Sequence, residues 1–185
     1  MDKLREKLIR GDANAWQGLY ADISPGLYRF VLARVGNPET AQDIMQEGFT
    51  RFAQNLARIK DSNSYKTWLY STCYRLTIDW HRARHAELPN NPWQRVDLHP
   101  PADPLTNILQ QEEHNIVRKA VLSLSASHRD VVIMRIWGQL SYSEIAEITG
   151  LPPGTLRSQF HWAIRKLRQT LGLKSDAIKD VNLSG

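Results

Sequence analysis

The sequence contains one cysteine, Cys73, and no long apolar run. A single cysteine excludes an intramolecular disulfide and a cysteine-based zinc site. No segment approaches the roughly 20 apolar residues that a membrane-spanning helix needs, and the charged first residues do not resemble a signal peptide. A phosphate-binding glycine loop and a nucleophile–base pattern are also missing. We therefore expect a cytoplasmic protein with no membrane insertion, no cofactor and no catalytic activity of its own.

Acidic residues are in the minority, since 24 Lys and Arg against 19 Asp and Glu give a formal net charge of +5. This balance favours a polyanionic partner. Five of the nine prolines lie in residues 86–104, which are acidic overall, whereas both flanking segments are basic. Proline interrupts a helix because it lacks the amide proton and clashes with the preceding turn. We predict two modules, residues 1–85 and 112–173, with a flexible linker over 86–111 and a tail over 174–185.

Both modules show helical periodicity and no strand-like alternation, so the predicted fold class is all-α with two small helical domains. Residues 38–59 place apolar side chains three and four positions apart, which is typical of a helix with one buried face. Another long helix is predicted over 63–84, with Cys73 as a small core residue near its apolar side. A helix over 13–35 is expected to be interrupted by the Ser-Pro-Gly stretch at 24–26.

The second module is predicted to contain a helix over 127–137 and then a helix-turn-helix. Ser141 and Glu144 have the spacing of a capping box, and Gly150 can end the helix that they begin. After the turn "LPPGT", the next helix is expected to start near Thr155. A short helix, a tight turn and a second helix form the arrangement that many proteins use to bind DNA.

A helical wheel separates this last helix into an apolar side and an outward side that is cationic, hydrogen-bonding and aromatic. The outward side contains Ser158, His161, Trp162, Arg165 and Gln169. Arginine can bind guanine or phosphate and glutamine can bind adenine, so this side favours contact with duplex DNA. The alternative is a solvated basic face on which a neighbouring helix covers the tryptophan.

Two blocks of the sequence resemble bacterial RNA polymerase sigma factors of the extracytoplasmic-function (ECF) group of the sigma-70 family. "AQDIMQEGFTRFAQNL" (41–56) and "YKTWLYSTCYRLTIDWHRAR" (65–84) resemble region 2, with its D-x-x-Q-E core. "GQLSYSEIAEITGLPPGTLRSQFHWAIRKL" (138–167) resembles region 4. The resemblance implies binding to core RNA polymerase and to promoter DNA, in a stress- or signal-responsive regulon under the control of an anti-sigma factor.

The resemblance also implies which residues contact each partner. The clamp helices of the largest polymerase subunit are expected to contact Asp43, Gln46 and Glu47. Opening and recognition of the −10 element are expected to involve Tyr74, Arg75, Asp79, Trp80, Arg82 and Arg84. Recognition of the −35 element in the major groove is expected to involve Thr155, Arg157, Ser158, Gln159, His161, Trp162 and Arg165.

Several alternatives stay open at this point. The face around Asp43 could be an ordinary solvated helix face, and Asp79 could cap its helix or pair with a nearby arginine. Gln159 and Trp162 replace residues that are commonly basic in the family, so the −35 sequence cannot be carried over from relatives. Trp162 suits a thymine methyl group, but it could equally pack on an inhibitor or on the polymerase flap.

Two other classes of protein are alternatives to the sigma factor. A repressor-like protein would bind duplex DNA tightly by itself, usually as a dimer. A helical metal-dependent hydrolase could be built on His81 and His85, which are four residues apart. That pair lacks the glutamate of H-E-x-x-H and a third ligand, so no metal site is predicted.

Overall fold

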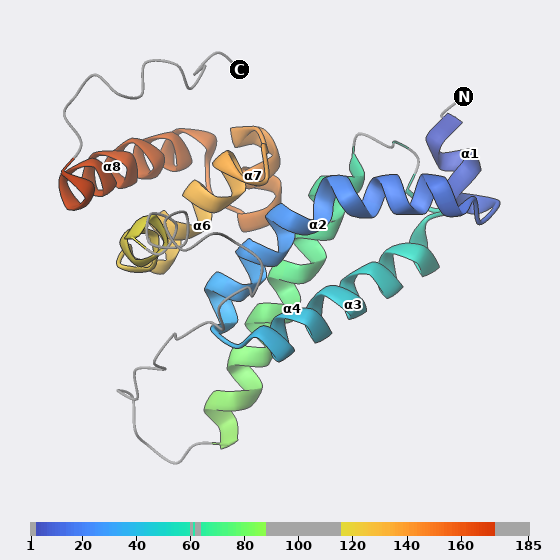
Figure 1. Ribbon diagram of the computed structural model, residues 1–185, viewed down its shortest axis with the longest axis horizontal. Coiled ribbons are helices and arrows are strands. Elements are labelled where there is room, and N and C mark those ends of the chain that lie inside the picture. Colours follow the sequence, from blue (N-terminus) through green and yellow to red (C-terminus); the bar gives the residue numbers. More distant parts are fainter. Residues whose placement is uncertain (1–2, 60, 62–63, 88–115, 173–185) are drawn as a thin grey trace. The chain divides into compact units, whose positions relative to one another are not determined.

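A computed structural model describes residues 3–59, 61, 64–87 and 116–172. Within these ranges the chain is helical and has no strand, which confirms the predicted all-α class. The chain divides into two compact units, the first built from α1 to α4 and the second containing α6, α8 and the start of α7 (Figure 1). Except for the start of residues 86–111, at the end of α4, the predicted linker and tail lie outside the described residues.

Helix α2 (Ala13–Val35) runs through residues 24–26 without a break, so the predicted interruption is wrong. Pro25 is exposed, and it removes one backbone hydrogen bond on the solvent side of the helix. Ile23 and Leu27 on either side of it are buried, and α2 packs on both α3 and α4. Burial of this continuous apolar face outweighs the local cost of the proline, because tertiary packing supplies most of the stability of a helix.

Helix α3 (Pro38–Asn55) follows α2 directly because both helix ends are capped. Gly36 ends α2 with a φ of 73°, and the side chain of Asn37 accepts a hydrogen bond of 2.9 Å from a backbone N–H in the first turn of α3. α3 is shorter than predicted, since it ends before Leu56. Leu56 is nevertheless buried, so the apolar stripe continues into the turn although the helix does not.

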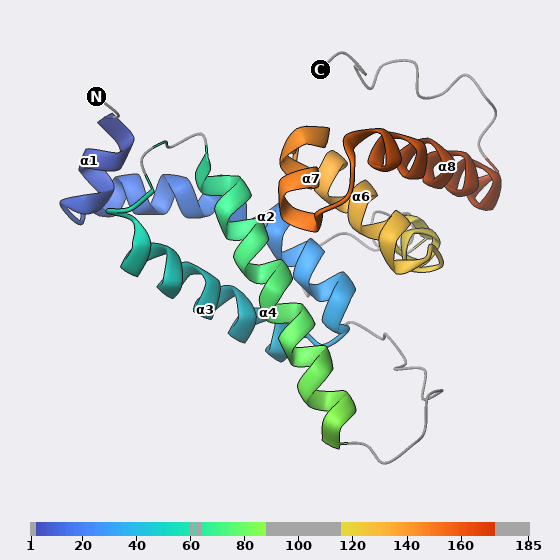
Figure 2. The same cartoon turned by 180° about the vertical axis from the view of Figure 1, so that it is seen from behind.

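Helices α2, α3 and α4 (Tyr65–Glu87) pack side by side in the first unit (Figures 1 and 2). Phe52 lies at the centre of an aromatic cluster formed by residues of all three helices. Its ring makes edge-to-face contacts with Trp16, Tyr65 and Trp68, at centroid distances of 6.0, 5.0 and 5.7 Å. Such contacts stabilise the core beyond the area that they bury. Leu69 is fully buried, whereas Trp68 is half-buried.

The helices α3 and α4 approach closely at Gly48. A β-carbon at this position would lie 2.5 Å from Sγ of Cys73. Cys73 is fully buried, with its thiol 3.9 Å from the carbonyl oxygen of Ile44, and burial raises its pKa to about 12. The thiol therefore stays protonated at neutral pH, and the prediction of a small core residue is confirmed.

Helix α1 (Lys3–Ile9) is joined to the turn after α3 by Arg5. The Arg5 guanidinium donates hydrogen bonds to the carbonyl oxygens of Ala57, at 2.7 Å, and Ile59, at 3.1 Å. The indole N–H of Trp16 donates to a carbonyl oxygen of α1 at 3.1 Å. The last carbonyl groups of a helix have no partner within the helix. These bonds satisfy such a group in α1 and two groups in the turn after α3.

We expect Arg5→Ala to lower the free energy of unfolding by about 1–2 kcal/mol, because it removes two hydrogen bonds from a charged donor. Arg5→Lys should recover only part of this loss, since one ammonium group cannot reproduce the planar fork. Chemical denaturation followed by circular dichroism measures both changes. Arg10→Ala, at an exposed arginine just after α1, is the control. Equal stability of Arg5→Ala and the unaltered chain would contradict the contact.

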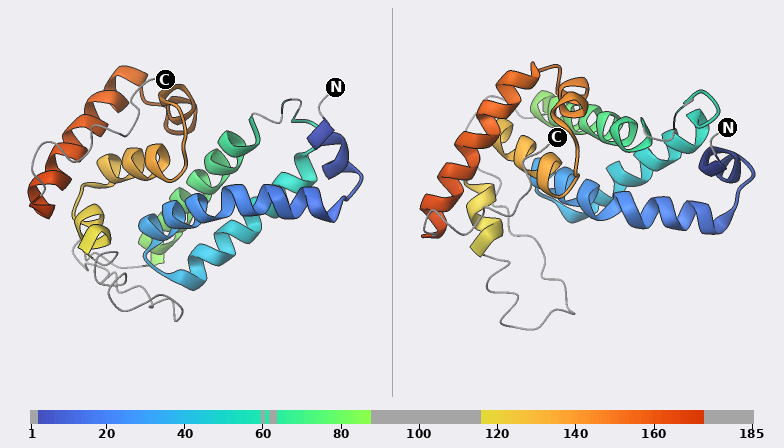
Figure 3. Two further views of the ribbon diagram at one scale, coloured as in Figure 1. Left: turned by 45° about the horizontal axis from the view of Figure 1, so that its top comes forward. Right: turned by 90° about the horizontal axis from the view of Figure 1, so that it is seen from above.

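The helix-turn-helix is formed by α7 (Tyr142–Thr149) and α8 (Pro153–Leu171). α6 (Ala126–Ile136) packs on α8, as the two views of Figure 3 show, and α7 lies between them in the chain. The capping box is confirmed: the Ser141 N–H donates to Glu144 Oε2 at 2.7 Å, and the Glu144 N–H donates to Ser141 Oγ at 3.2 Å. Gly150 has a φ of 75° after α7. α8 begins earlier than Thr155, because a proline is suited to the first helical position.

The apolar side of α8 is buried as the wheel predicts, through Leu156, Phe160, Ala163 and Leu167. The residues on its outward side, Ser158, His161, Trp162, Arg165 and Gln169, are all exposed. Within the described ranges, no helix combines the length and the apolar character that crossing a membrane requires.

Candidate nucleic-acid and protein interfaces

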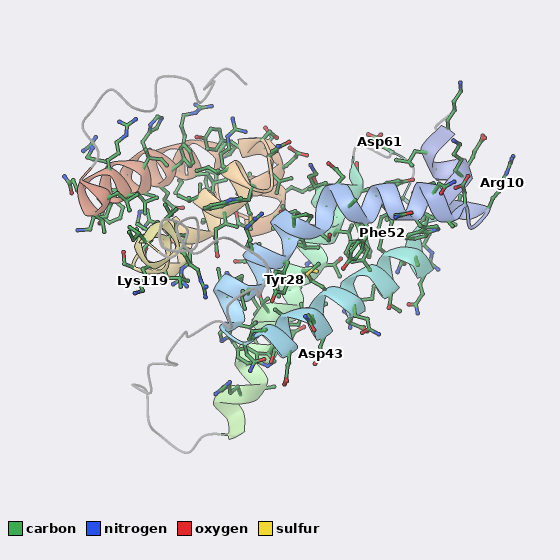
Figure 4. All side chains as sticks on the ribbon, in the orientation of Figure 1. Arg10, Tyr28, Asp43, Phe52, Asp61 and Lys119 are labelled. Atoms are coloured by element: carbon green, nitrogen blue, oxygen red, sulfur yellow. The ribbon has the colours of Figure 1, made fainter. Side chains whose placement is uncertain are left out.

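One exposed face of α3 contains Asp43, Gln46 and Glu47. Figure 4 shows Asp43 projecting from the outer side of the helix. Glu47 forms an ion pair with Arg51 one turn later, with 2.6 Å between Oε1 and Nε, and both side chains are about half exposed. An exposed pair of this kind contributes at most about 1 kcal/mol. Glu47 can therefore exchange it for a contact with another protein at little cost.

A groove of about 820 Å³ lies between α2 and α3 beside this face. Tyr20 is 53% exposed at the groove, and its ring packs on Phe49 at a centroid distance of 5.0 Å. Gln46 lines the groove as well as the polar face. The acidic face and the aromatic groove are thus continuous, which suits a protein partner with both basic and apolar side chains.

The end of α4 contains the side chains predicted for the −10 element. Arg75, Asp79, Arg82 and Arg84 are exposed, and Trp80 is half-buried. Arg82 Nη1 lies 3.7 Å from Asp79 Oδ1, so the pairing considered for Asp79 does occur, between two well-exposed groups. The Arg84 guanidinium lies 5.3 Å from the Trp80 ring centroid. Cations, an aromatic ring and a carboxylate together suit both the DNA backbone and unstacked bases.

Tyr74 is half-buried like Trp80, and its ring packs on side chains of α2. The ring of Phe30 stacks on it at 6.4 Å between centroids, and the Arg34 guanidinium lies 4.5 Å from its centroid. Arg34 also donates a hydrogen bond of 2.7 Å from Nε to Oγ1 of Thr77. Arg34 could not be predicted from the sequence, because nothing in the pattern of α4 reveals which residue of α2 packs against it.

His81 is engaged at the end of α2. Its Nε2 donates a hydrogen bond of 2.9 Å to the carbonyl oxygen of Arg34. The side chain of His85 lies outside the described residues. Among the residues whose side chains are described, no three His, Cys, Asp or Glu groups are arranged to hold a metal ion.

The outward face of α8 is cationic and contains no acidic residue. Thr155, Arg157, Ser158, His161, Trp162 and Arg165 are exposed. Gln159 differs from them because it is half-buried, and its Oε1 is buried with no hydrogen-bond partner among the described residues. The Arg157 guanidinium lies 5.4 Å from the ring centroid of Tyr142 in α7, which fixes its position relative to the preceding helix.

Trp162 is 48% exposed, yet its ring is not isolated. Its centroid lies 4.3 Å from that of His128 in the first turn of α6, with 34° between the ring planes. The hydroxyl of Ser125 is hydrogen-bonded to Nδ1 of His128. His128 could not be predicted from the sequence, since the wheel of α8 shows that Trp162 points outward but not what lies beside it.

The arrangement is that of an all-helical protein with an exposed acidic and aromatic face in one unit and a cationic helix-turn-helix in the other. Comparison with protein families gives the same division. Residues 19–87 match the model of Sigma-70 region 2, and residues 114–167 match that of Sigma-70, region 4. The chain belongs to the sigma-70 family of RNA polymerase sigma factors, in its ECF group.

Individual relatives agree with this membership over nearly the whole chain. The ECF RNA polymerase sigma factor SigW of Bacillus subtilis is 28% identical over 181 residues, which cover 92% of this chain and 97% of SigW. SigL of Mycobacterium tuberculosis is 28% identical over 162 residues, 86% of this chain and 90% of SigL. The sigma factor RpoE of Bartonella quintana, solved with the anti-sigma factor NepR, has the same fold, with a TM-score of 0.66 at 22% identity over 86% of this chain and 98% of RpoE.

Proposed function

We propose that the chain binds core RNA polymerase and directs promoter recognition, promoter opening and transcription initiation, in a stress- or signal-responsive regulon. The observation that supports this most is the pairing of two different surfaces in one chain. An acidic and aromatic face on α2 and α3 suits a protein, and an acid-free face on α8 suits DNA. The chain acts in the cytoplasm, where the polymerase is, and nucleotide polymerisation is catalysed by the polymerase.

The proposed division of labour follows the two modules. Residues 1–85 bind polymerase through Asp43, Gln46 and Glu47 and hold the −10 element, residues 112–173 recognise the −35 element, and residues 86–111 link them. An anti-sigma factor is the proposed regulator, since RpoE of Bartonella quintana was solved with one. Such an inhibitor would act by covering the polymerase-binding and DNA-binding faces.

The side chains proposed for the −35 element divide by chemistry. Arg157 and Arg165 can bind phosphates or guanine, and His161 and Ser158 can donate hydrogen bonds. Trp162 offers an apolar surface for a thymine methyl group. Gln159 is half-buried, so its amide is less accessible to DNA than the exposed side chains of this face.

DNA binding with and without polymerase separates this function from that of a repressor. The probe is a labelled duplex library with both promoter elements randomised, incubated with the chain, with core polymerase, or with both. We expect specific complexes only when both proteins are present. Tight and selective binding of duplex DNA by a dimer of the chain alone would contradict the proposal and favour the repressor.

Asp79→Ala is expected to change the base preference at one position of the −10 element by roughly tenfold, because a carboxylate can accept a hydrogen bond from N4 of cytosine. Arg82→Ala is the matched control, since it removes the same 3.7 Å ion pair but keeps the carboxylate. Sequencing of transcripts from a library randomised at the −10 element measures the preference. An equal and uniform loss in both variants would show that Asp79 acts only through the ion pair.

A further inference from the structure

Trp162 projects from the outward face of α8, where its indole packs on His128. Its ring lies 4.3 Å from that of His128, and about half of the residue stays exposed. His128 belongs to α6, which precedes the helix-turn-helix, whereas Trp162 shares its face with His161 and Arg165. One side of the indole is therefore supported from within its own unit while the remainder is accessible to a ligand.

The support for His128 is unusual for the start of a helix. Ser125 occupies the N-cap of α6, where a serine hydroxyl normally accepts a hydrogen bond from a backbone N–H of the first turn. In this chain the Ser125 side chain makes no such bond. Its hydroxyl is bonded to Nδ1 of His128 instead. The bond restricts rotation of the imidazole, so that the ring is held against the indole.

We propose that His128, held by Ser125, is a positioning residue that fixes the indole of Trp162 for contact with a thymine methyl group in the −35 element, and so contributes to base preference. The proposal rests on the proposed function. An exposed side chain loses rotational freedom when it docks, which weakens binding. A ring that is already held in place loses less freedom, so its contact discriminates better between thymine and other bases.

The test uses transcription by core polymerase with the full chain, on a promoter library randomised at the −35 element. Trp162→Ala should abolish a thymine preference at one position. His128→Ala should reduce that same preference about two- to tenfold, which corresponds to the cost of ordering one large side chain. His128→Phe keeps a flat ring beside the indole and should restore most of the preference. Ser125→Ala should give an intermediate result.

A double substitution distinguishes positioning from a general structural effect. If His128 acts through Trp162, adding His128→Ala to Trp162→Ala should change the −35 profile no further. A uniform loss of transcripts with an unchanged profile in His128→Ala, or an equal effect of His128→Ala with and without Trp162, would overturn the proposal. Thermal unfolding of each variant confirms that the unit is folded.

Different results would overturn the positioning role of His128 and the proposed function of the chain. An unchanged −35 profile in Trp162→Ala, with specific transcription intact, would overturn the positioning role and leave the proposed function standing. Absence of specific transcripts with the unaltered chain, while the same core polymerase works with another sigma factor, would overturn both.

Discussion

Reversing the charge of Asp43 and Glu47 together is expected to weaken binding of the chain to core RNA polymerase at least about tenfold. Both carboxylates are exposed on α3, beside the aromatic groove between α2 and α3. Lysines at these positions would repel the basic side chains that an acidic face is suited to bind, and such like-charge juxtaposition costs several kcal/mol. Stability should change little, because the only ion pair lost within the described residues is the exposed one with Arg51.

Competition with a labelled sigma factor for a fixed amount of core polymerase measures this loss. The control is the double variant Glu6→Lys and Asp22→Lys, which changes the net charge by the same amount but places the lysines on α1 and α2. This control also removes an ion pair, since Asp22 lies 3.7 Å from Lys66. The double variant Asp43→Asn and Glu47→Gln should bind core polymerase with an affinity between those of the control and the charge reversal. Equal affinity of the reversal and the control would mean that this face of α3 does not bind polymerase.

Gly48→Ala is expected to destabilise the first unit by about 1–3 kcal/mol, which is the usual range for overpacking a core. The added β-carbon would lie 2.5 Å from the buried Sγ of Cys73, so α3 and α4 must separate or the thiol must move. Neither adjustment is easy, because Cys73 is fully buried and its neighbours Leu69 and Tyr70 are too. The effect opposes helix propensity, since alanine is intrinsically the better helix former.

Gly18→Ala is the matched control for this substitution. Gly18 is also inside a helix, but a β-carbon there meets nothing within 4 Å, so alanine should stabilise by about 0.4–1 kcal/mol. Adding Cys73→Ala to Gly48→Ala should recover part of the loss, because the clashing sulfur is gone. Denaturant unfolding of the unaltered chain, the two single variants and the double variant measures the coupling between positions 48 and 73. Simple additivity of Gly48→Ala and Cys73→Ala would contradict a direct clash.

Features encoded by short-range patterns could be predicted from the sequence. The capping box of Ser141 and Glu144, the left-handed Gly150 and the burial of Cys73 depend on spacing within one or two turns, and the structure confirms them. The outward direction of Trp162 followed from helical periodicity for the same reason. Local rules failed at Pro25, where packing of α2 against two other helices overrides the cost of a proline.

Contacts between distant segments could not be predicted in the same way. Two such contacts are those of Arg34 with Tyr74 and of His128 with Trp162. Each joins two helices, and the sequence of one helix does not reveal how it packs on the other. The accessibility of Tyr74 and the support of Trp162 depend on these contacts. The sequence therefore predicted which face of each helix is exposed. Only the structure shows which side chains of neighbouring helices contact that face.

Transcription in a reconstituted system shows directly whether the chain acts as a sigma factor. The purified chain is mixed with bacterial core polymerase and a promoter library randomised at the −35 and −10 elements, and the transcripts are sequenced. We expect defined start sites that require both proteins and share two spaced sequence elements. Absence of specific transcripts, with a core polymerase that initiates normally with another sigma factor, would contradict this expectation.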